Sequence, residues 1–146
     1  MATGRGSYQR REPVLQVGLL NKDSRRAGST YAKIDTGADI TTLDAEWAPR
    51  LGIDLEECEL VPVGAATEQP VYHHCYADGL AINVAGEPLF LPLVMFCKRK
   101  GIALLGRNDF FQRYLVLLDE RNKRFFLERI PDPVEDDDPD IELVAT

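Results

Sequence analysis

The residues with the clearest chemical potential are Asp35-Thr36-Gly37, which directly follow the strand-like segment Ser29–Ile34. Glycine permits a sharp turn, so the Asp35 carboxylate is expected to be presented at the end of a strand. A carboxylate in such a place can take a proton from water and act as a general base. The same three residues also suit an ordinary Asx turn, in which the carboxylate only accepts backbone N–H bonds. The triplet alone leaves both interpretations open.

Two further features follow this triplet along the chain. The runs Glu57–Val63 and Val71–Tyr76 flank the tip Gly64–Pro70, which is the pattern of a long hairpin. An apolar strand then ends in Gly-Arg-Asn, within Leu104–Asn108. In this order the features resemble those of the retroviral-type aspartic proteases, the retropepsins, with their Asp-Thr-Gly-Ala-Asp segment, hairpin flap and Gly-Arg-Asn/Asp segment. The resemblance covers about residues 13–130, although the spacing is longer and the hairpin tip is less glycine-rich than in many retroviral enzymes.

The resemblance implies a role for each residue of the triplet. Asp35 is expected to be the catalytic aspartate, and the Thr36 hydroxyl to lock the two active-site loops across a dimer. Gly37 is expected to contact the substrate backbone. Ile40 would make the neighbouring subsite apolar, which favours hydrophobic residues around the scissile bond. The residues predicted to bind substrate are Gly37, Ala38, Asp39, Ile40, Gly64, Ala65 and Ala66.

Three residues are expected to support the active-site loop. The resemblance implies that Asp39 and Arg107 tie this loop to the helix after Gly106, with Asn108 beside them. We expect Asp39 and Arg107 to form a partly buried, bidentate ion pair, which would be costly to break from one side. Outside the resemblance, Arg107 would be interpreted as a surface arginine.

A physical constraint on peptide hydrolysis predicts a homodimer. One carboxyl group must activate water while another protonates the leaving side, and two neighbouring carboxyls that share a proton provide both roles. The chain has a single Asp-Thr-Gly, so a two-fold axis must place Asp35 beside its own copy. The predicted function is an aspartic endopeptidase acting on extended polypeptides. The alternative is a non-catalytic, retropepsin-like dimerisation or peptide-binding module.

The elements that must position these residues are many short strands with regular turns between them. This pattern predicts an all-β barrel or sandwich, and the resemblance favours a small closed β-barrel with a flap hairpin and one or two short helices. The expected strands are Val14–Leu20, Ser29–Ile34, Ile40–Leu43, Glu57–Val63, Val71–Tyr76, Leu80–Val84, Leu89–Phe96, Ile102–Leu105, Tyr114–Leu118 and Arg124–Ile130. The expected helices are Ala45–Leu51 and a turn capped by Asn108 or Asp109.

The charge distribution divides the chain into three parts. The net charge is −7, and residues 132–146 hold seven acids and no base, so residues 1–131 balance at 17 − 17 = 0. We expect a mobile basic arm over residues 1–12, a protease domain over 13–131 and an acidic disordered tail over 132–146. The tail is interpreted as a solvated extension or linker, or alternatively as a segment that restrains activity by folding over the basic loop Lys98–Lys100 or the arm Arg5–Arg11. Lys98-Arg99-Lys100 is interpreted as a solvated loop.

Several other classes of function are poorly supported. Residues 1–131 have no net charge, so they are not expected to form the concentrated basic face that nucleic-acid binding needs. The sequence also contains no run of 18 apolar residues, which a membrane span would require. We expect no metal or other cofactor, because neighbouring residues of His73-His74-Cys75 point to opposite faces of a strand. The sequence contains no G-x-S-x-G motif, the pattern that would indicate a serine nucleophile. The three widely spaced cysteines indicate reduced thiols and a cytoplasmic location.

Overall fold

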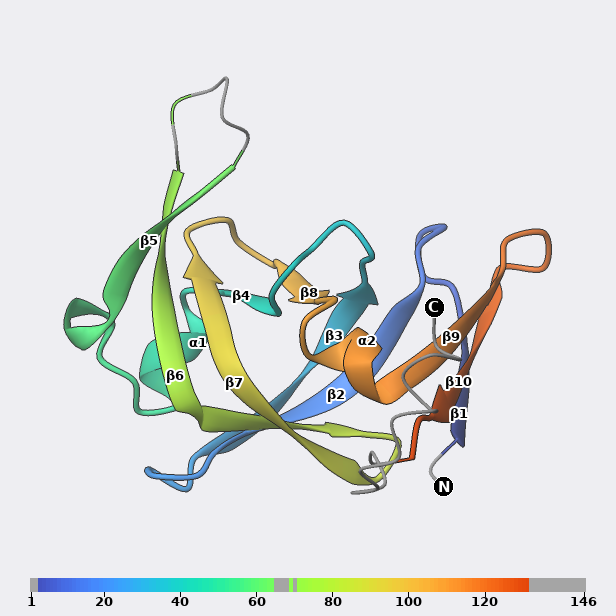
Figure 1. Ribbon diagram of the computed structural model, residues 1–146, viewed down its shortest axis with the longest axis horizontal. Helices are drawn as coiled ribbons and strands as arrows, with labels where there is room; N and C mark the ends of the chain where they lie inside the picture. The colour runs from blue at the N-terminus through green and yellow to red at the C-terminus, as the bar shows by residue number, and fades with distance from the viewer. Residues whose placement is uncertain (1–2, 65–68, 70, 132–146) are drawn as a thin grey trace, which may run out of the picture.

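A computed structural model describes residues 3–64, 69 and 71–131, and most of these described residues lie in β-strands (Figure 1). The strands are β1 (Thr3–Ser7), β2 (Val14–Asn21), β3 (Ala27–Ile34), β4 (Thr42–Asp44), β5 (Glu59–Val63), β6 (Val71–Val84), β7 (Glu87–Cys97), β8 (Ala103–Leu105), β9 (Tyr114–Asp119) and β10 (Arg124–Arg129). The short helices are α1 (Trp47–Arg50), a 3-10 turn (Leu55–Glu57) and α2 (Phe110–Arg113).

Six strands close into a barrel. They follow the order β2-β3-β8-β4-β7-β6, and the pairing of β2 with β6 completes the ring. β5 pairs only with the first part of β6, so the β5–β6 hairpin extends beyond the barrel, to the upper left in Figure 1. The expectation of an all-β, closed barrel with short helices is confirmed.

The barrel interior is filled by alternate residues of its strands. In β2, Val17 and Leu19 are buried while their neighbour Leu20 is exposed. In β6, Leu80 and Ile82 are buried with exposures of 1% each. Each such side chain contributes about 1.5–3 kcal/mol when it leaves water, so the barrel is a rigid frame for the loops at its ends.

The order of the strands brings two loops together. β8 lies between β3 and β4, and it runs parallel to β3. Parallel neighbours end at the same edge of a sheet, so the segments that follow β3 and β8 leave the barrel side by side. The chain from β3 to β4 must also cross the end of β8. This crossing positions Asp35, and it is not visible in the hydrophobic pattern of the sequence.

The long strand β6 was expected as two separate strands, Val71–Tyr76 and Leu80–Val84. The structure joins them into one, with a register irregularity between Ala77 and Leu80. Asp78 adopts the left-handed conformation there, with φ of 58°, which makes a β-bulge. The bulge lets the same strand belong to the barrel at one end and to the β5–β6 hairpin at the other.

The expectation of a mobile arm over residues 1–12 is wrong for residues 3–7. This segment is β1, which pairs antiparallel with β10 in a separate sheet of order β1-β10-β9. Its glycines allow the pairing, because a Cβ on Gly6 would lie 2.5 Å from the ring of the fully buried Phe125. The segment has few apolar residues, so its sequence carries no strand signal. The acidic tail, 132–146, lies outside the described residues.

Replacement of Gly6 by alanine tests whether β1 is an integral strand. The new Cβ would collide with the Phe125 ring, so we expect Gly6→Ala to lower the free energy of unfolding by about 1–3 kcal/mol. Arg5→Ala is the matched control in the same strand, because this side chain is exposed and its loss should cost within about 0.5 kcal/mol. Urea unfolding measures both. Equal stability of the two variants would mean that β1 does not pack on β10.

Candidate functional site

Asp35 occupies a tight turn immediately after β3. Its N–H donates to the Leu105 carbonyl at 3.3 Å, which joins it to the end of β8. Its Oδ1 accepts from the Gly37 N–H at 2.8 Å, and its carbonyl accepts from the Ala38 N–H at 3.2 Å. The Asx turn is therefore present, and it fixes the carboxyl group through one oxygen. No hydrogen bond within the described residues occupies the other oxygen, Oδ2.

The segment after β8 holds the Asp35 loop through the backbone. The Arg107 and Asn108 N–H groups donate to the carbonyls of Ala38 and Asp39, each at 2.9 Å. Gly106 allows this close approach, because a Cβ there would lie 2.5 Å from the carbonyl carbon of Ile40. The structure thus brings Arg107 and Asn108 against the loop, with backbone N–H groups making the contact.

The Asp39–Arg107 ion pair differs from the expected one. The Arg107 Nη2 atom contacts Asp39 Oδ1, and no second guanidinium contact to this carboxylate is present within the described residues. The side chains are 57% and 68% exposed, so the prediction of a partly buried bidentate pair is wrong for this chain. The backbone bonds already join the two loops, and these side chains remain in solvent. Exposed pairs of this kind contribute about 0–1 kcal/mol.

A buried polar contact between Thr41 and Asp109 was not predicted from the sequence. The Thr41 hydroxyl donates to Asp109 Oδ1 at 2.8 Å, and the Thr41 N–H donates to Oδ2 at 3.2 Å. The same hydroxyl accepts from the Gly106 N–H at 3.2 Å. Thr41 is 0% and Asp109 is 6% exposed. We call this arrangement the Thr41–Asp109 clamp. Asp109 was recognised only as a possible cap of α2, and it does accept from the Phe110 N–H.

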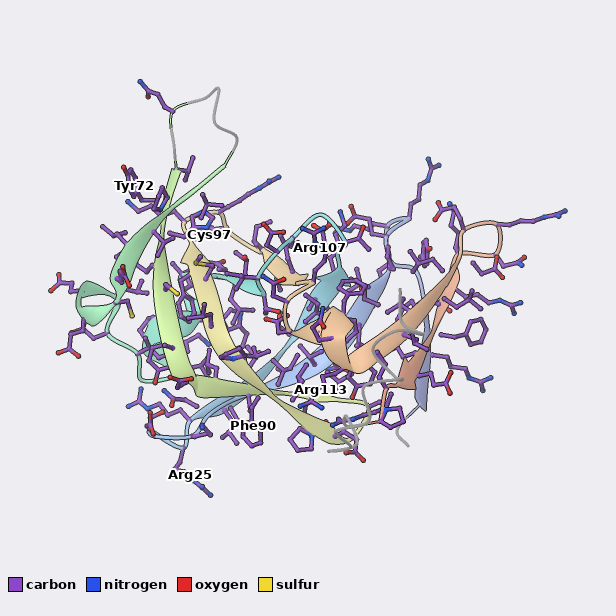
Figure 2. The ribbon with its side chains drawn as sticks, in the orientation of Figure 1. Arg25, Tyr72, Phe90, Cys97, Arg107 and Arg113 are labelled. Carbon is purple, nitrogen blue, oxygen red and sulfur yellow. The ribbon has the colours of Figure 1, made fainter. Side chains whose placement is uncertain are left out.

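A groove of about 890 Å³ opens beside Asp35. One wall is the Asp35 loop, and the opposite wall comes from Val61–Gly64 of the β5–β6 hairpin together with Val71 and His73. The end of β7 and the residues after it complete the groove. In Figure 2, Cys97 marks this β7 side, beside the hairpin, and Arg107 marks the side of the Asp35 loop.

Asp35 lines this groove, and so do most of the residues that were predicted to bind substrate. These predicted residues are Gly37, Ala38, Asp39, Ile40 and Gly64. Ala65 and Ala66 lie outside the described residues. Thr36 is exposed and makes no side-chain hydrogen bond within the described residues, so any locking role needs a group from another molecule.

The groove walls are mainly apolar, and His73 is one of their polar residues, to which the sequence analysis assigned no role. Its Nδ1 atom is buried and has no hydrogen-bond partner within the described residues. Loss of hydration lowers the pKa of the His73 ring below its usual value. Val61 and Leu104 provide apolar surface in the same groove, which matches a binding site for hydrophobic side chains.

Among the described residues, no three His, Cys, Asp or Glu side chains gather as a metal ion would require. Nor does any helix in the described part of the chain have the length and apolar character to cross a membrane.

Comparison with known structures agrees with this geometry. The chain matches the crystal structure of a retropepsin-like aspartic protease from Rickettsia conorii, with a TM-score of 0.59 and 18% sequence identity. The match covers 86% of this chain and 92% of the rickettsial one. The fold is retropepsin-like. No protein-family model and no curated protein matches the sequence, so the retropepsin-like likeness rests on the three-dimensional arrangement.

The Thr41–Asp109 clamp can be tested by removing one hydroxyl group. Thr41→Val keeps the shape of the side chain and leaves a buried carboxyl group short of a donor, so we expect a loss of about 1.5–3 kcal/mol in the free energy of unfolding. Thr42→Val is the matched control, because its hydroxyl donates only to the Ile40 carbonyl at 3.0 Å and is half-buried. Urea denaturation of both variants measures the difference. Similar losses in the free energy of unfolding for both variants would show that the clamp stabilises the fold no more than the half-buried Thr42 hydroxyl does.

The pKa of His73 is a second test of the groove. We expect the ring to titrate below about 6.5 in the folded chain, because burial disfavours its charged form. The unfolded chain then binds this proton at higher pH, so folding stability falls as the pH drops below about 6.5. Nuclear magnetic resonance titration measures the pKa, with His73→Gln to assign the signal. A value at or above 6.5 would contradict the packing described for this ring.

Proposed function

We propose that the chain is an aspartic endopeptidase that hydrolyses peptide bonds in extended polypeptides, with Asp35 as its catalytic residue. The observation that carries this proposal is the position of Asp35, which is fixed by its turn at the side of a groove in a retropepsin-like fold. The solved structure with this fold is itself described as an aspartic protease, which supports the same chemistry here.

The groove suits a peptide in extended conformation. Its volume of about 890 Å³ lies within the range of ordinary ligand sites, and its apolar walls can receive alternate side chains. We assign the β5–β6 hairpin the role of a flap that closes over the peptide. Gly64 directly follows β5 and has a φ of 130°, and no heavy atom lies within 4 Å of the position that a Cβ would take. It can therefore approach a substrate backbone closely.

The chemistry requires a second carboxyl group, and we propose that it comes from a second copy of the chain. Thr36 and Gly37 are exposed, which leaves the active-site turn accessible to such a partner. A two-fold axis through this turn would place the two Asp35 side chains together, because an isologous contact pairs identical residues at the axis. The exposed Thr36 hydroxyl would then find its partner across the interface.

The proposed mechanism uses one proton shared by the pair. Two adjacent carboxyl groups resist double ionisation, so one is charged and the other is protonated. The ionised Asp35 takes a proton from water while the water oxygen attacks the peptide carbonyl carbon. The protonated copy of Asp35 donates a hydrogen bond to the carbonyl oxygen. The proton that Asp35 took from water then passes to the amide nitrogen, the C–N bond breaks, and the pair again holds one shared proton. The titration belongs to the pair rather than to either residue.

We further propose that the protein works in a reducing compartment such as the cytoplasm. An odd number of cysteines with no C-x-x-C spacing supports this assignment.

Replacement of Asp35 by asparagine tests the proposed function. Asparagine keeps the shape of the side chain but cannot take up a proton, so we expect peptide cleavage to fall by about 10²–10⁴-fold or more while the dimer remains. A peptide-library cleavage assay over pH 3–7 measures the rate, and sedimentation measures the dimer. Asp78→Asn is the control, because this carboxylate lies in the β6 bulge and does not line the groove.

Two outcomes would contradict the proposal. One is hydrolysis by a chain that stays monomeric at the assay concentration, and the other is a cleavage rate in Asp35→Asn equal to that of the wild type. If neither protein cleaves and both bind peptides equally, the chain is a non-catalytic binding module.

A further inference from the structure

The residues directly after β7 bring positive charge to the groove. Lys98 and Arg99 both line it, together with Asp35. Lys100, the third base of the same run, has its Nζ 3.7 Å from the Glu46 carboxylate instead. Adjacent bases of one loop therefore have different environments, and only two of them belong to the groove. Lys98-Arg99-Lys100 is therefore more than a solvated loop, because Lys98 and Arg99 line the groove.

Hydrogen bonds at both ends hold the backbone of this loop in place. The Cys97 carbonyl accepts from the Ala45 N–H at 2.7 Å at one end. At the other end, the buried Asp44 carboxylate accepts from the Gly101 N–H at 2.8 Å, and the Asp44 N–H donates to the Ile102 carbonyl at 2.8 Å. The chain from β4 to α1 thus fixes the loop, so Lys98 and Arg99 are presented from a defined backbone position.

The charges of Lys98 and Arg99 are not neutralised by the described part of the chain. No carboxylate of residues 3–64, 69 and 71–131 forms an ion pair with either side chain. Asp39, an acid of the same groove, contacts Arg107 instead. Asp35 is committed to its own turn through one oxygen. Beside apolar walls, two cations that have no ion-pair partner in the described part of the chain produce a field that attracts anions.

We propose that Lys98 and Arg99 form a subsite for an acidic side chain, so that the enzyme prefers polypeptides with Asp or Glu near the scissile bond. This inference rests on the proposed function. The guanidinium group offers a planar fork that matches a carboxylate, and lysine adds a second positive charge beside it. In a two-fold dimer each copy supplies one such pair. The substrate therefore meets two basic subsites, one on each side of the bond that breaks.

Matched peptides and charge-reversal variants of the full chain test this subsite. Peptides with Glu at the flanking positions are compared with the same peptides carrying Gln. For wild type we expect kcat/KM to be about two- to fivefold higher for each acidic residue, as an exposed ion pair allows. Lys98→Glu with Arg99→Glu should reverse this preference, and Lys98→Gln with Arg99→Gln should abolish it. Lys100→Glu is the control and should retain the wild-type preference.

Two further measurements separate this subsite from general charge effects and from catalysis. The preference should shrink towards unity in 1 M salt, where the Debye length falls to about 3 Å. Fluorescence anisotropy of the same peptides on Asp35→Asn should show the same dependence on charge without turnover. Equal kcat/KM for Glu and Gln peptides, or a preference unchanged by the double reversal, would overturn the subsite and leave the proposed hydrolysis standing. Glu-dependent binding without cleavage by wild type would overturn the hydrolysis and leave the subsite standing.

Discussion

The crossing of the Asp35 loop over the end of β8 is the constraint on which the rest of the site depends. Two loops from parallel strands meet there, and the Thr41–Asp109 clamp joins them out of contact with water. Hydrogen bonds of this kind are strong because the alternative is a buried carboxyl group without donors. Gly106 belongs to the same constraint, because no side chain fits between it and the backbone of Ile40. The position of Asp35 follows from these contacts.

Buried and exposed polar groups have separate roles around this crossing. The buried groups, Thr41 and Asp109, satisfy one another within the chain and hold the loops together. The exposed groups, including Thr36 and the Asp39–Arg107 pair, contribute little to the stability of a single copy. They are therefore accessible to a substrate or a second copy. Such a division is expected where a site must be rigid before its partner arrives.

Parts of this structure could be predicted from sequence because their signals are local. Alternating apolar residues predicted strands such as β2 and β10, and the Asp-Thr-Gly triplet identified the turn at Asp35. β1 was not predicted, because its glycines allow a close approach to Phe125 but do not produce an alternating hydrophobic pattern. The Thr41–Asp109 clamp joins residues 68 positions apart, and the pairing of β8 with both β3 and β4 brings them together. The expectation for Asp39 and Arg107 came from the family resemblance, and no local signal in the sequence reports how deeply such a pair is buried.

The shape of the groove links binding to assembly in the proposed enzyme. One copy provides an active-site loop, a hairpin and a basic loop, but a single Asp35 carboxyl group. If catalysis needs two copies, a polypeptide that spans both halves binds the dimer more tightly than the monomer, and by mass action it also stabilises the dimer. In the proposed dimer, an acidic substrate would also neutralise the positive charge that Lys98 and Arg99 bring to each half of the groove. Substrate charge, in this scheme, affects both recognition and the population of the active assembly.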